Sequence, residues 1–324
     1  MMAVQIQGDG GSEGLYLGAY PRPEPGPYEV LVAVAATAVN RADILQRQGK
    51  YPPPPGASPI LGLEMAGRVV ATGSMARRWT IGDRVCGLLD GGGYAAYAVI
   101  HEDLALPIPE GMSLPEAAAL PEVYMTAYQA LFWLADLQAG ERVLIHAGAS
   151  GVGTAAIQLA RLKGAEVWVT ASAGKHEACQ ALGASRTIDY RSQDFAEVVK
   201  EATDGKGVPV ILDFLAAPYF QQNLASLALD GRLVMLALMG GIKTEVNLAP
   251  ILLKRLRVMG STLRNRELPY KIALAEALRE FAWPALSRGQ IRPVIDRMMP
   301  IAQVTEAHRL LETNATTGKV VLTM

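Results

Sequence analysis

HAGASGVGT, residues 146–154, is the stretch that decides the fold of this chain. It overlaps the end of the mostly apolar run RVLIH at 142–146, which predicts a buried strand, and leads into AAIQLA at 155–160, which predicts a helix. A glycine-rich turn between a strand and a helix places backbone N–H groups and the positive end of the helix where a phosphate can bind. The stretch therefore predicts a site for the pyrophosphate of a dinucleotide.

The glycines of this turn have three expected roles: the tight turn, the close approach of the pyrophosphate and the close packing of helix on strand. The candidate phosphate-binding residues are Gly148, Ser150, Gly151, Val152 and Gly153, with Ser150 in place of the usual middle glycine. Glycines recur in ordinary strand-to-helix turns, so the motif alone is a weak signal. Its position at the start of a long run of alternating strands and helices favours dinucleotide binding over an ordinary turn that binds no ligand.

That run of alternating elements predicts a doubly wound α/β domain of the Rossmann type, in which helices cover both faces of a parallel sheet. The expected strands are 142–147, 166–170, 186–189, 209–213 and 231–236, and the expected helices lie near 151–163, 174–182, 193–203 and 218–228. A sixth strand, near 257–263, would complete the sheet.

The chain before this run has a different pattern. Short apolar runs at 30–34, 68–71 and 95–100 are separated by Gly and Pro clusters, which is typical of a compact, β-rich domain. Ser113 and Glu116 have the spacing of a capping box, so a helical segment is expected to begin at about residue 114.

The tail of the chain does not continue the alternation. It is expected to hold a long helix at 270–287, a short strand, a helix at 304–313 and a last strand at 319–323. We therefore expect the tail to fold back onto the first part, so that the Rossmann domain is an insertion. The expected domains are 1–123 together with 265–324, and 124–264.

Composition excludes several classes of protein. The chain has 324 residues and a formal net charge of −1, so it can form two cores but has no concentrated basic face for a nucleic acid. Its two cysteines, Cys86 and Cys179, cannot build a disulfide framework, which fits a reducing compartment. The sequence shows neither a secretory signal pattern nor an apolar run of membrane-spanning length, so we expect a cytoplasmic protein without a membrane partner.

The residues after the second expected strand indicate which dinucleotide binds. A carboxylate at this position would bind the ribose 2′-OH of NAD. This chain has Ser172 and Lys175 instead, and Tyr190 after the third strand can add its hydroxyl. A hydroxyl and a cation attract a 2′-phosphate, so the sequence favours NADPH over NADH. The alternative is that Lys175 is simply an exposed lysine at the start of a helix.

Several separated motifs, in the right order, resemble the medium-chain dehydrogenase/reductase superfamily over nearly the whole chain. Two motifs resemble those of the superfamily in general: GDRV at 82–85 and GLEMAG at 62–67. Two others resemble its quinone oxidoreductase branch, which includes zeta-crystallin: VNRAD at 39–43 and QGKYP at 48–52. The likeness is closest to the tumour-suppressor-induced quinone oxidoreductase subgroup, and its motifs are QRQGKYPPP at 46–54, LALMGG at 236–241 and GKVVL at 318–322. The resemblance implies that the β-rich domain is a GroES-like catalytic domain.

Departures from the superfamily pattern imply an enzyme without zinc. Zinc-dependent members place Cys, His and Cys around a catalytic metal, and a lobe with four close cysteines holds a structural zinc. Here Asn40 and Leu63 stand where the first Cys and the His would be, and the four-cysteine lobe is absent. Zinc needs three or four nitrogen or sulfur ligands, which these positions do not supply.

The resemblance also implies roles for residues of the active-site cleft. Asn40 would lie beside the nicotinamide and hydrogen-bond an acceptor oxygen, unless it only caps a turn. Tyr51 would donate a hydrogen bond or a proton to the substrate, unless it only packs on the proline loop. Glu64 is expected to be a structural acid that braces the cleft. The further expected cofactor contacts are Thr126, Leu238, Met239, Gly240, Leu263, Arg264 and Lys319.

These features together predict an NADPH-dependent quinone reductase that transfers a hydride, or electrons, to a quinone without a metal. Among enzymes, the alternative is an NADPH-dependent reductase of 2-alkenal or enoyl double bonds. A crystallin-like protein that binds NADPH is the alternative from another class. A homodimer is expected through the apolar edge strand near 257–262.

Overall fold

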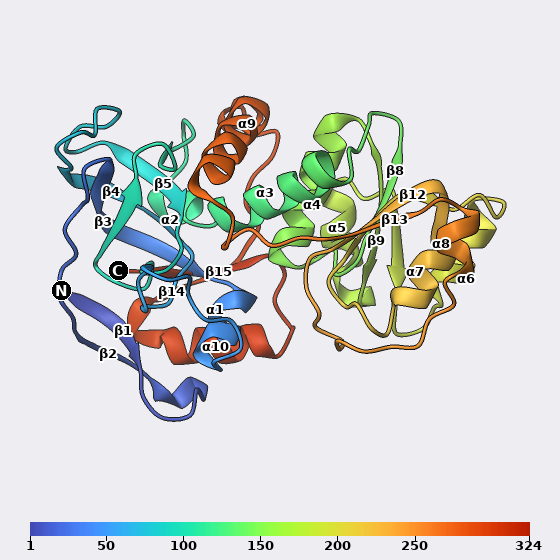
Figure 1. The fold of residues 1–324 in the computed structure, drawn as a ribbon, viewed down its shortest axis with the longest axis horizontal. Coiled ribbons are helices and arrows are strands. Elements are labelled where there is room, and N and C mark those ends of the chain that lie inside the picture. The colour runs from blue at the N-terminus through green and yellow to red at the C-terminus, as the bar shows by residue number, and fades with distance from the viewer. The chain divides into compact units, whose positions relative to one another are not determined.

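The computed structural model describes residues 1–324 and divides into two units (Figure 1). The β-rich unit comprises Met1–Met125 and Arg264–Met324, and the Rossmann unit comprises Thr126–Leu263. The Rossmann unit is thus an insertion in the chain of the β-rich unit.

A parallel sheet of six strands forms the centre of the Rossmann unit, in the order β10-β9-β8-β11-β12-β13. Its strands are β8 (Arg142–Ile145), β9 (Glu166–Ala171), β10 (Arg186–Asp189), β11 (Val208–Asp213), β12 (Leu227–Met235) and β13 (Arg257–Gly260). The predicted α/β class and doubly wound sheet are confirmed. β12 begins at Leu227 rather than near residue 231, so residues 227 and 228, which were expected to end the preceding helix, belong to the strand.

Helices cover both faces of this sheet (Figure 1). One face carries α4 (Gly151–Lys163) and α5 (His176–Leu182), and the other carries α6 (Phe195–Ala202), α7 (Phe220–Ser226) and the short α8 (Ala249–Leu253). Short turns of other helix types are η2 (Gln129–Leu134) and η3 (Ala173–Lys175). α4 ends at Gly164, whose φ of 88° lies in the left-handed region that favours glycine at a helix C-terminus.

The strand order reverses between β8 and β11, which lie side by side at the middle of the sheet. From β8 the chain proceeds outward through β9 and β10, whereas β11 starts the other half of the sheet. Ligands of open α/β sheets bind at the carboxyl ends of the strands where the order reverses. The glycine turn that follows β8 therefore lies at the expected ligand-binding edge.

The β-rich unit contains a seven-stranded sheet and a separate β1–β2 hairpin. The order of the sheet is β14-β15-β3-β4-β5-β7, and β6 pairs with β3. Its strands are β3 (Glu29–Val39), β4 (Glu64–Thr72), β5 (Arg84–Leu88), β6 (Tyr97–His101), β7 (Leu106–Pro107), β14 (Ile295–Pro300) and β15 (Lys319–Thr323). The hairpin is formed by β1 (Met2–Ile6) and β2 (Leu15–Ala19).

The tail of the chain completes this sheet. β15 runs antiparallel to β3, with Val320 opposite Val39, and β14 runs parallel to β15. The core beneath these strands includes Leu322 and Tyr94, neither of which is exposed. The register places the first residue of β15 beside the end of β3, and this decides which side chains meet in the candidate site.

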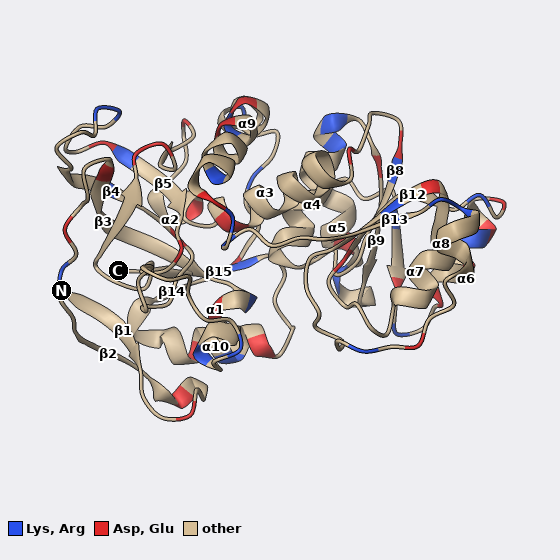
Figure 2. Ribbon diagram, viewed as in Figure 1, with Lys and Arg blue, Asp and Glu red and all other residues tan.

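The β-rich unit also contains four helices, and a fifth continues into the Rossmann unit. They are α1 (Arg41–Arg47), α2 (Leu114–Ala117), α9 (Leu268–Ser287), α10 (Val304–Glu312) and the shared α3 (Pro121–Tyr128), with the 3₁₀ turns η1 (Ser12–Gly14) and η4 (Ile301–Gln303). The predicted capping box is present, since Oγ of Ser113 accepts from the N–H of Glu116 at 3.3 Å. Neither unit has a helix with the length and apolar character needed to cross a bilayer. Acidic and basic residues are interspersed along both units (Figure 2).

Candidate cofactor and acceptor sites

The glycine turn has the geometry of a phosphate site. Oγ of Ser150 accepts from the N–H of Gly153 at 3.1 Å and thereby caps α4. The first N–H groups of a helix have no acceptor within the helix, so those of Gly151 and Val152 remain for a ligand. They lie at the positive end of a 13-residue helix. The residues present therefore fit the pyrophosphate of a dinucleotide.

Two glycines of the turn are required by packing. A Cβ on Gly148 would lie 2.6 Å from Cβ of Val169, and one on Gly153 would collide with the carbonyl oxygen of Ala147. Any larger residue would therefore push the turn away from β9 or open the start of α4. Motifs of this type predict that the helix packs closely on the strand, and this close packing depends on Gly148 and Gly153.

The end of β9 fits a 2′-phosphate. The strand ends at Ala171 with no carboxylate, and the carbonyl of Ser172 then accepts from the N–H of Lys175 at 2.9 Å, which leaves the hydroxyl of Ser172 without a capping bond. The ring of Tyr190, after β10, is 44% exposed. Arg191, which is not among the residues expected from the sequence, has its Cζ 5.9 Å from the centre of that ring. Its place directly after the third strand was the available signal.

The segment after β12 is held by the loop that follows β11. The N–H of Met239 donates to the carbonyl of Phe214 at 3.1 Å, and the N–H of Gly240 donates to that of Leu215 at 2.9 Å. Leu238 and Met239 expose about half of their side chains. These backbone N–H groups are therefore not available to a nicotinamide carboxamide, whereas the carbonyl oxygens of Met239 and Gly240 are.

Two other expected cofactor contacts lie near the ends of the Rossmann unit. Thr126 is the first residue of the unit and lies within α3. Leu263 is its last residue and is buried. Neither position has a feature of its own that identifies a ligand.

In the β-rich unit, Asn40, Glu64 and Lys319 form a closed cluster. Asn40 follows β3, Glu64 begins β4 and Lys319 begins β15, so the pairing of these three strands brings the side chains together. Nζ of Lys319 lies 2.8 Å from Oε1 of Glu64, and Nδ2 of Asn40 donates to the same oxygen at 2.9 Å. None of the three residues is more than 5% exposed.

This cluster uses nearly all the hydrogen-bonding capacity of its members. The ammonium of Lys319 donates to Oδ1 of Asn40, to the carbonyl of Val39 and to Glu64, which accounts for its three N–H groups. The NH₂ of Asn40 also contacts the carbonyl oxygen of Ala38 at 3.3 Å. Asn40 is thus the N-cap residue of α1 and a link in the cluster, and Glu64 has the bracing position expected for it.

Arg264 holds the loop that carries Tyr51. Its Nη2 donates to Oε1 of Gln46 at 2.8 Å, and its Nε donates to the carbonyl of Asp90 at 2.9 Å. Its Cζ lies 5.3 Å from the centre of the Tyr51 ring. Lys271 secures the loop after β5, because its Nζ lies 2.7 Å from the carboxylate of Asp90. Arg264 and Lys319, both expected to contact the cofactor, thus direct their donors to protein groups.

The hydroxyl of Tyr51 makes no hydrogen bond within the protein, in contrast to these saturated groups. Burial raises the pKa of this phenol above its usual value, and the nearby Arg264 partly opposes the shift. Tyr51 is therefore protonated at neutral pH and can donate its proton in a hydrogen bond to a ligand.

A second buried chain of polar groups joins α1 to α10, and no spacing in the sequence indicated it. Nη1 of Arg47 lies 3.1 Å from Nδ1 of His308, so Nδ1 accepts and Nε2 carries the proton. Nε2 lies 3.1 Å from the hydroxyl oxygen of Tyr94, which donates to Asp43 at 3.3 Å. Burial raises the pKa of Asp43 to about 6 and lowers the pKa of His308 to about 3.

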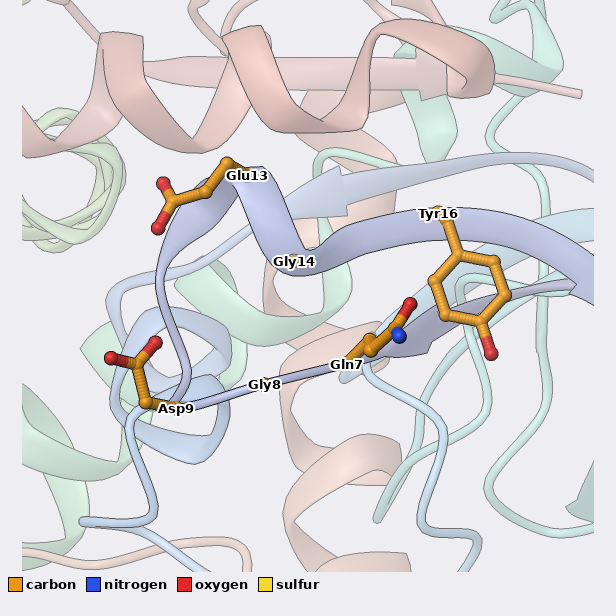
Figure 3. Close-up of a pocket in the computed structure, with 6 residues that line it drawn as sticks. All are labelled: Gln7, Gly8, Asp9, Glu13, Gly14 and Tyr16. Carbon is orange, nitrogen blue, oxygen red and sulfur yellow. The ribbon is translucent and has the colours of Figure 1, made fainter.

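No group of three or more His, Cys, Asp or Glu side chains is arranged to hold a metal ion. A hollow of about 310 Å³ lies beside the β1–β2 hairpin (Figure 3). It is lined by Gln7, Gly8, Asp9, Glu13, Gly14 and Tyr16. None of the candidate site residues lines this hollow.

Family models match both parts of the chain. An alcohol dehydrogenase GroES-like domain matches residues 26–110, and a zinc-binding dehydrogenase model matches residues 151–280. The chain belongs to the medium-chain dehydrogenase/reductase superfamily and is similar to quinone oxidoreductases and enoyl reductases. The GroES-like character expected for the β-rich domain is confirmed.

Three solved structures of similar proteins cover 100% of this chain. The CurK enoyl reductase is 32% identical with a TM-score of 0.88, and 99% of it is covered. A quinone oxidoreductase of Pseudomonas syringae is 30% identical with a TM-score of 0.87, also with 99% covered. The mycobacterial protein Rv1454c, solved in complex with NADPH, is 29% identical with a TM-score of 0.89 and is covered completely.

Curated relatives include much longer proteins. A mycocerosic acid synthase-like polyketide synthase of Mycobacterium tuberculosis is 32% identical over 99% of this chain, which spans 15% of that protein. A phenolphthiocerol synthesis polyketide synthase of Mycobacterium bovis is 44% identical over 63% of this chain, and the match spans 10% of its length. The chain thus corresponds to a small part of these synthases.

Proposed function

We propose that this chain is an NADPH-dependent quinone reductase that acts without a metal ion. The observation that carries the proposal is the closed cluster of Asn40, Glu64 and Lys319. Its charged and amide groups are satisfied by one another, so they do not polarise an acceptor carbonyl. An acceptor that is intrinsically easy to reduce needs only to be bound and oriented, and quinones have this property.

The preference for NADPH rests on the Rossmann unit. When bound, NADPH supplies a hydride from its nicotinamide ring. Gly151 and Val152 would hold the pyrophosphate through their N–H groups. Ser172 and Lys175 would hold the 2′-phosphate, with Tyr190 and Arg191 beside it. A carboxylate at the end of β9, which would repel that phosphate, is absent.

A second candidate function is the reduction of an activated double bond in a 2-alkenal or an enoyl thioester. It is favoured by the hydroxyl of Tyr51, which has no protein partner and remains protonated. Reduction of such a double bond requires a proton at carbon after the hydride, and Tyr51 would donate it. The similarity to an enoyl reductase supports this candidate as well.

The test is steady-state oxidation of NADPH and of NADH, followed by nicotinamide absorbance, with three kinds of acceptor. These are 1,4-benzoquinone, a larger quinone such as phenanthrenequinone, and a 2-alkenal. We expect rapid turnover of the quinones with NADPH and slow turnover with NADH. Turnover of the alkenal alone would identify a double-bond reductase. Tight binding of NADPH without turnover would instead support the crystallin-like binding protein.

We also infer a homodimer through the edge strand β13. The strand has no second neighbour in the sheet, and its unpaired backbone groups can pair with a copy of itself. The adjacent helix α8 exposes 79% of Leu252 and 73% of Leu253, which a partner would cover. A monomeric mass in sedimentation equilibrium would reject this dimer.

A further inference from the structure

Four polar side chains form one hydrogen-bonded network beneath the glycine turn of the Rossmann unit. Nδ1 of His146 lies 3.0 Å from Oγ1 of Thr170, and Nε2 of His146 lies 2.7 Å from Oδ1 of Asn223. Nδ2 of Asn223 donates to Oδ2 of Asp213 at 3.0 Å. The network therefore crosses the carboxyl edge of the sheet, from β9 through the end of β8 to β11 and α7.

The direction of each bond follows from Asp213. A carboxylate accepts hydrogen bonds, so Asn223 turns its NH₂ toward Asp213 and its oxygen toward His146. His146 consequently carries its proton on Nε2, and its Nδ1 accepts from the hydroxyl of Thr170. Burial lowers the pKa of His146, which keeps the imidazole neutral in this arrangement.

One end of the network supports the start of the phosphate turn. The N–H of Ala147 donates to Oγ1 of Thr170 at 3.3 Å. Ala147 has a φ of 49°, a left-handed conformation that is uncommon outside glycine and needs support from its surroundings. The bond to Thr170 supplies part of that support.

The other end holds the loop after β11. The carboxylate of Asp213 accepts from the N–H of Leu215 at 2.7 Å and from that of Ala216 at 3.1 Å. The carbonyl of Leu215 in turn accepts from the N–H of Gly240 at 2.9 Å. The network thus connects the phosphate turn to the segment 238–240 through hydrogen bonds and the backbone of Leu215.

The network is sealed from water. None of its four side chains is more than 1% exposed, and the rings of Phe195 and Tyr219 pack against the imidazole at 4.7 and 4.8 Å. A partner lost from such a network leaves a buried polar group unpaired, because no solvent replaces it.

We propose that His146 is a positioning residue that sets the spacing between the phosphate turn and the segment 238–240, and so aligns the nicotinamide end of NADPH. This role rests on the proposed binding of NADPH. An imidazole suits it because one ring nitrogen donates and the other accepts on the far side of the ring, which joins Asn223 to Thr170.

The experiment measures the Kd values of NADPH and of 2′,5′-ADP, which carries only the adenosine end, together with kcat and thermal stability. The variants are His146→Phe and the milder Thr170→Val, with Thr203→Val as the matched control. Thr203 is also buried and bonded twice, to the carbonyl of Val199 and the N–H of Gly207, but it precedes β11 at the opposite edge of the sheet.

We expect His146→Phe and Thr170→Val to raise the Kd of NADPH about tenfold and to lower kcat, with less than about a twofold change for 2′,5′-ADP. Thr203→Val should lower thermal stability and leave both Kd values unchanged. Parallel losses of NADPH and 2′,5′-ADP binding, or a Thr203→Val result like that of Thr170→Val, would overturn the positioning role. A wild-type chain that binds 2′,5′-ADP but not NADPH would also overturn it, whereas one that binds neither would overturn the proposed function.

Discussion

The ammonium of Lys319 lies 2.8 Å from the carboxylate of Glu64, and the two side chains are 3% and 0% exposed. Removing two charges from water is costly, and their attraction offsets that cost only when both are present and hydrogen-bonded. Asn40 and the N–H of Glu122 supply the remaining bonds to the carboxylate. The pair is therefore part of the structural frame of the β-rich unit.

Loss of one member of this pair should be strongly destabilising. We expect Lys319→Met to lower the free energy of unfolding by about 3–5 kcal/mol, because it leaves the carboxylate of Glu64 buried without its cation. The control is the double variant Lys319→Met with Glu64→Gln, which removes both charges and should lose less. Denaturant unfolding checks both, and a single variant as stable as the wild type would contradict the prediction.

The hydroxyl of Tyr51 should separate the two candidate activities. We expect Tyr51→Phe to reduce kcat for a 2-alkenal by about 10²-fold or more, because proton transfer to carbon depends on it. Reduction of a quinone, whose oxygens take protons from solvent, should fall only a few fold. The exposed Tyr28 provides the control Tyr28→Phe, which should change neither activity. Equal losses with both acceptors would contradict a selective role.

The cation after β9 should determine the choice of cofactor. We expect Lys175→Ala to raise the Kd of NADPH about tenfold, a loss of about 1.4 kcal/mol of ion pairing with the 2′-phosphate, with little change for NADH. Lys206→Ala removes an exposed charge from the amino edge of the same sheet and serves as the control. The prediction is wrong if NADPH and NADH lose affinity together, or if the control variant has the same effect.

His308 should make the β-rich unit sensitive to acid. Burial and Arg47 lower its pKa from 6.5 to about 3, so the stability that it contributes is complete above pH 6.5 and is lost as pH falls toward 3. We expect His308→Gln to flatten this part of the stability profile. His101→Gln, at a partly exposed histidine, should keep the slope of the wild type.

Asp43 changes stability in the opposite direction over part of the same range. Its pKa is raised from 3.8 to about 6, so its contribution is complete below pH 3.8 and is lost as pH rises through 6. Because His308→Gln leaves this contribution in place, the variant should gain stability as pH falls from 6 to 4. Identical pH profiles of the wild type and His308→Gln would contradict the assignment.

The hydroxyl of Ser226 is buried and has no hydrogen-bond partner. Removing an unpaired polar group relieves its desolvation cost, so Ser226→Ala should be neutral or stabilising by up to about 1 kcal/mol. Ser150→Ala, which removes the cap of α4, is the matched comparison and should cost about 1 kcal/mol. A loss of stability with Ser226→Ala as large as that with Ser150→Ala would show that the hydroxyl is paired in solution.

The sequence by itself determined the features that depend on neighbouring residues. The alternation of strands and helices from Arg142 onward predicts the parallel sheet, and Ser113 with Glu116 predicts the start of α2. These signals are readable because hydrophobic periodicity and helix capping act over a few residues. The glycine turn belongs to this class only in part, since Gly153 is required by a contact with Ala147 in the same turn, whereas Gly148 is required by a contact with Val169 of the neighbouring strand β9.

Only the tertiary structure decided what the polar residues contact. Asn40 was expected to face an acceptor, but its amide is bonded to Glu64, 24 residues away, and to Lys319, 279 residues away. His146 showed no functional spacing in the sequence, yet it joins Thr170 to Asn223 across the edge of the sheet. The physical reason is that strand order and register, set by the packing of whole sheets, determine which distant side chains share a buried hydrogen bond.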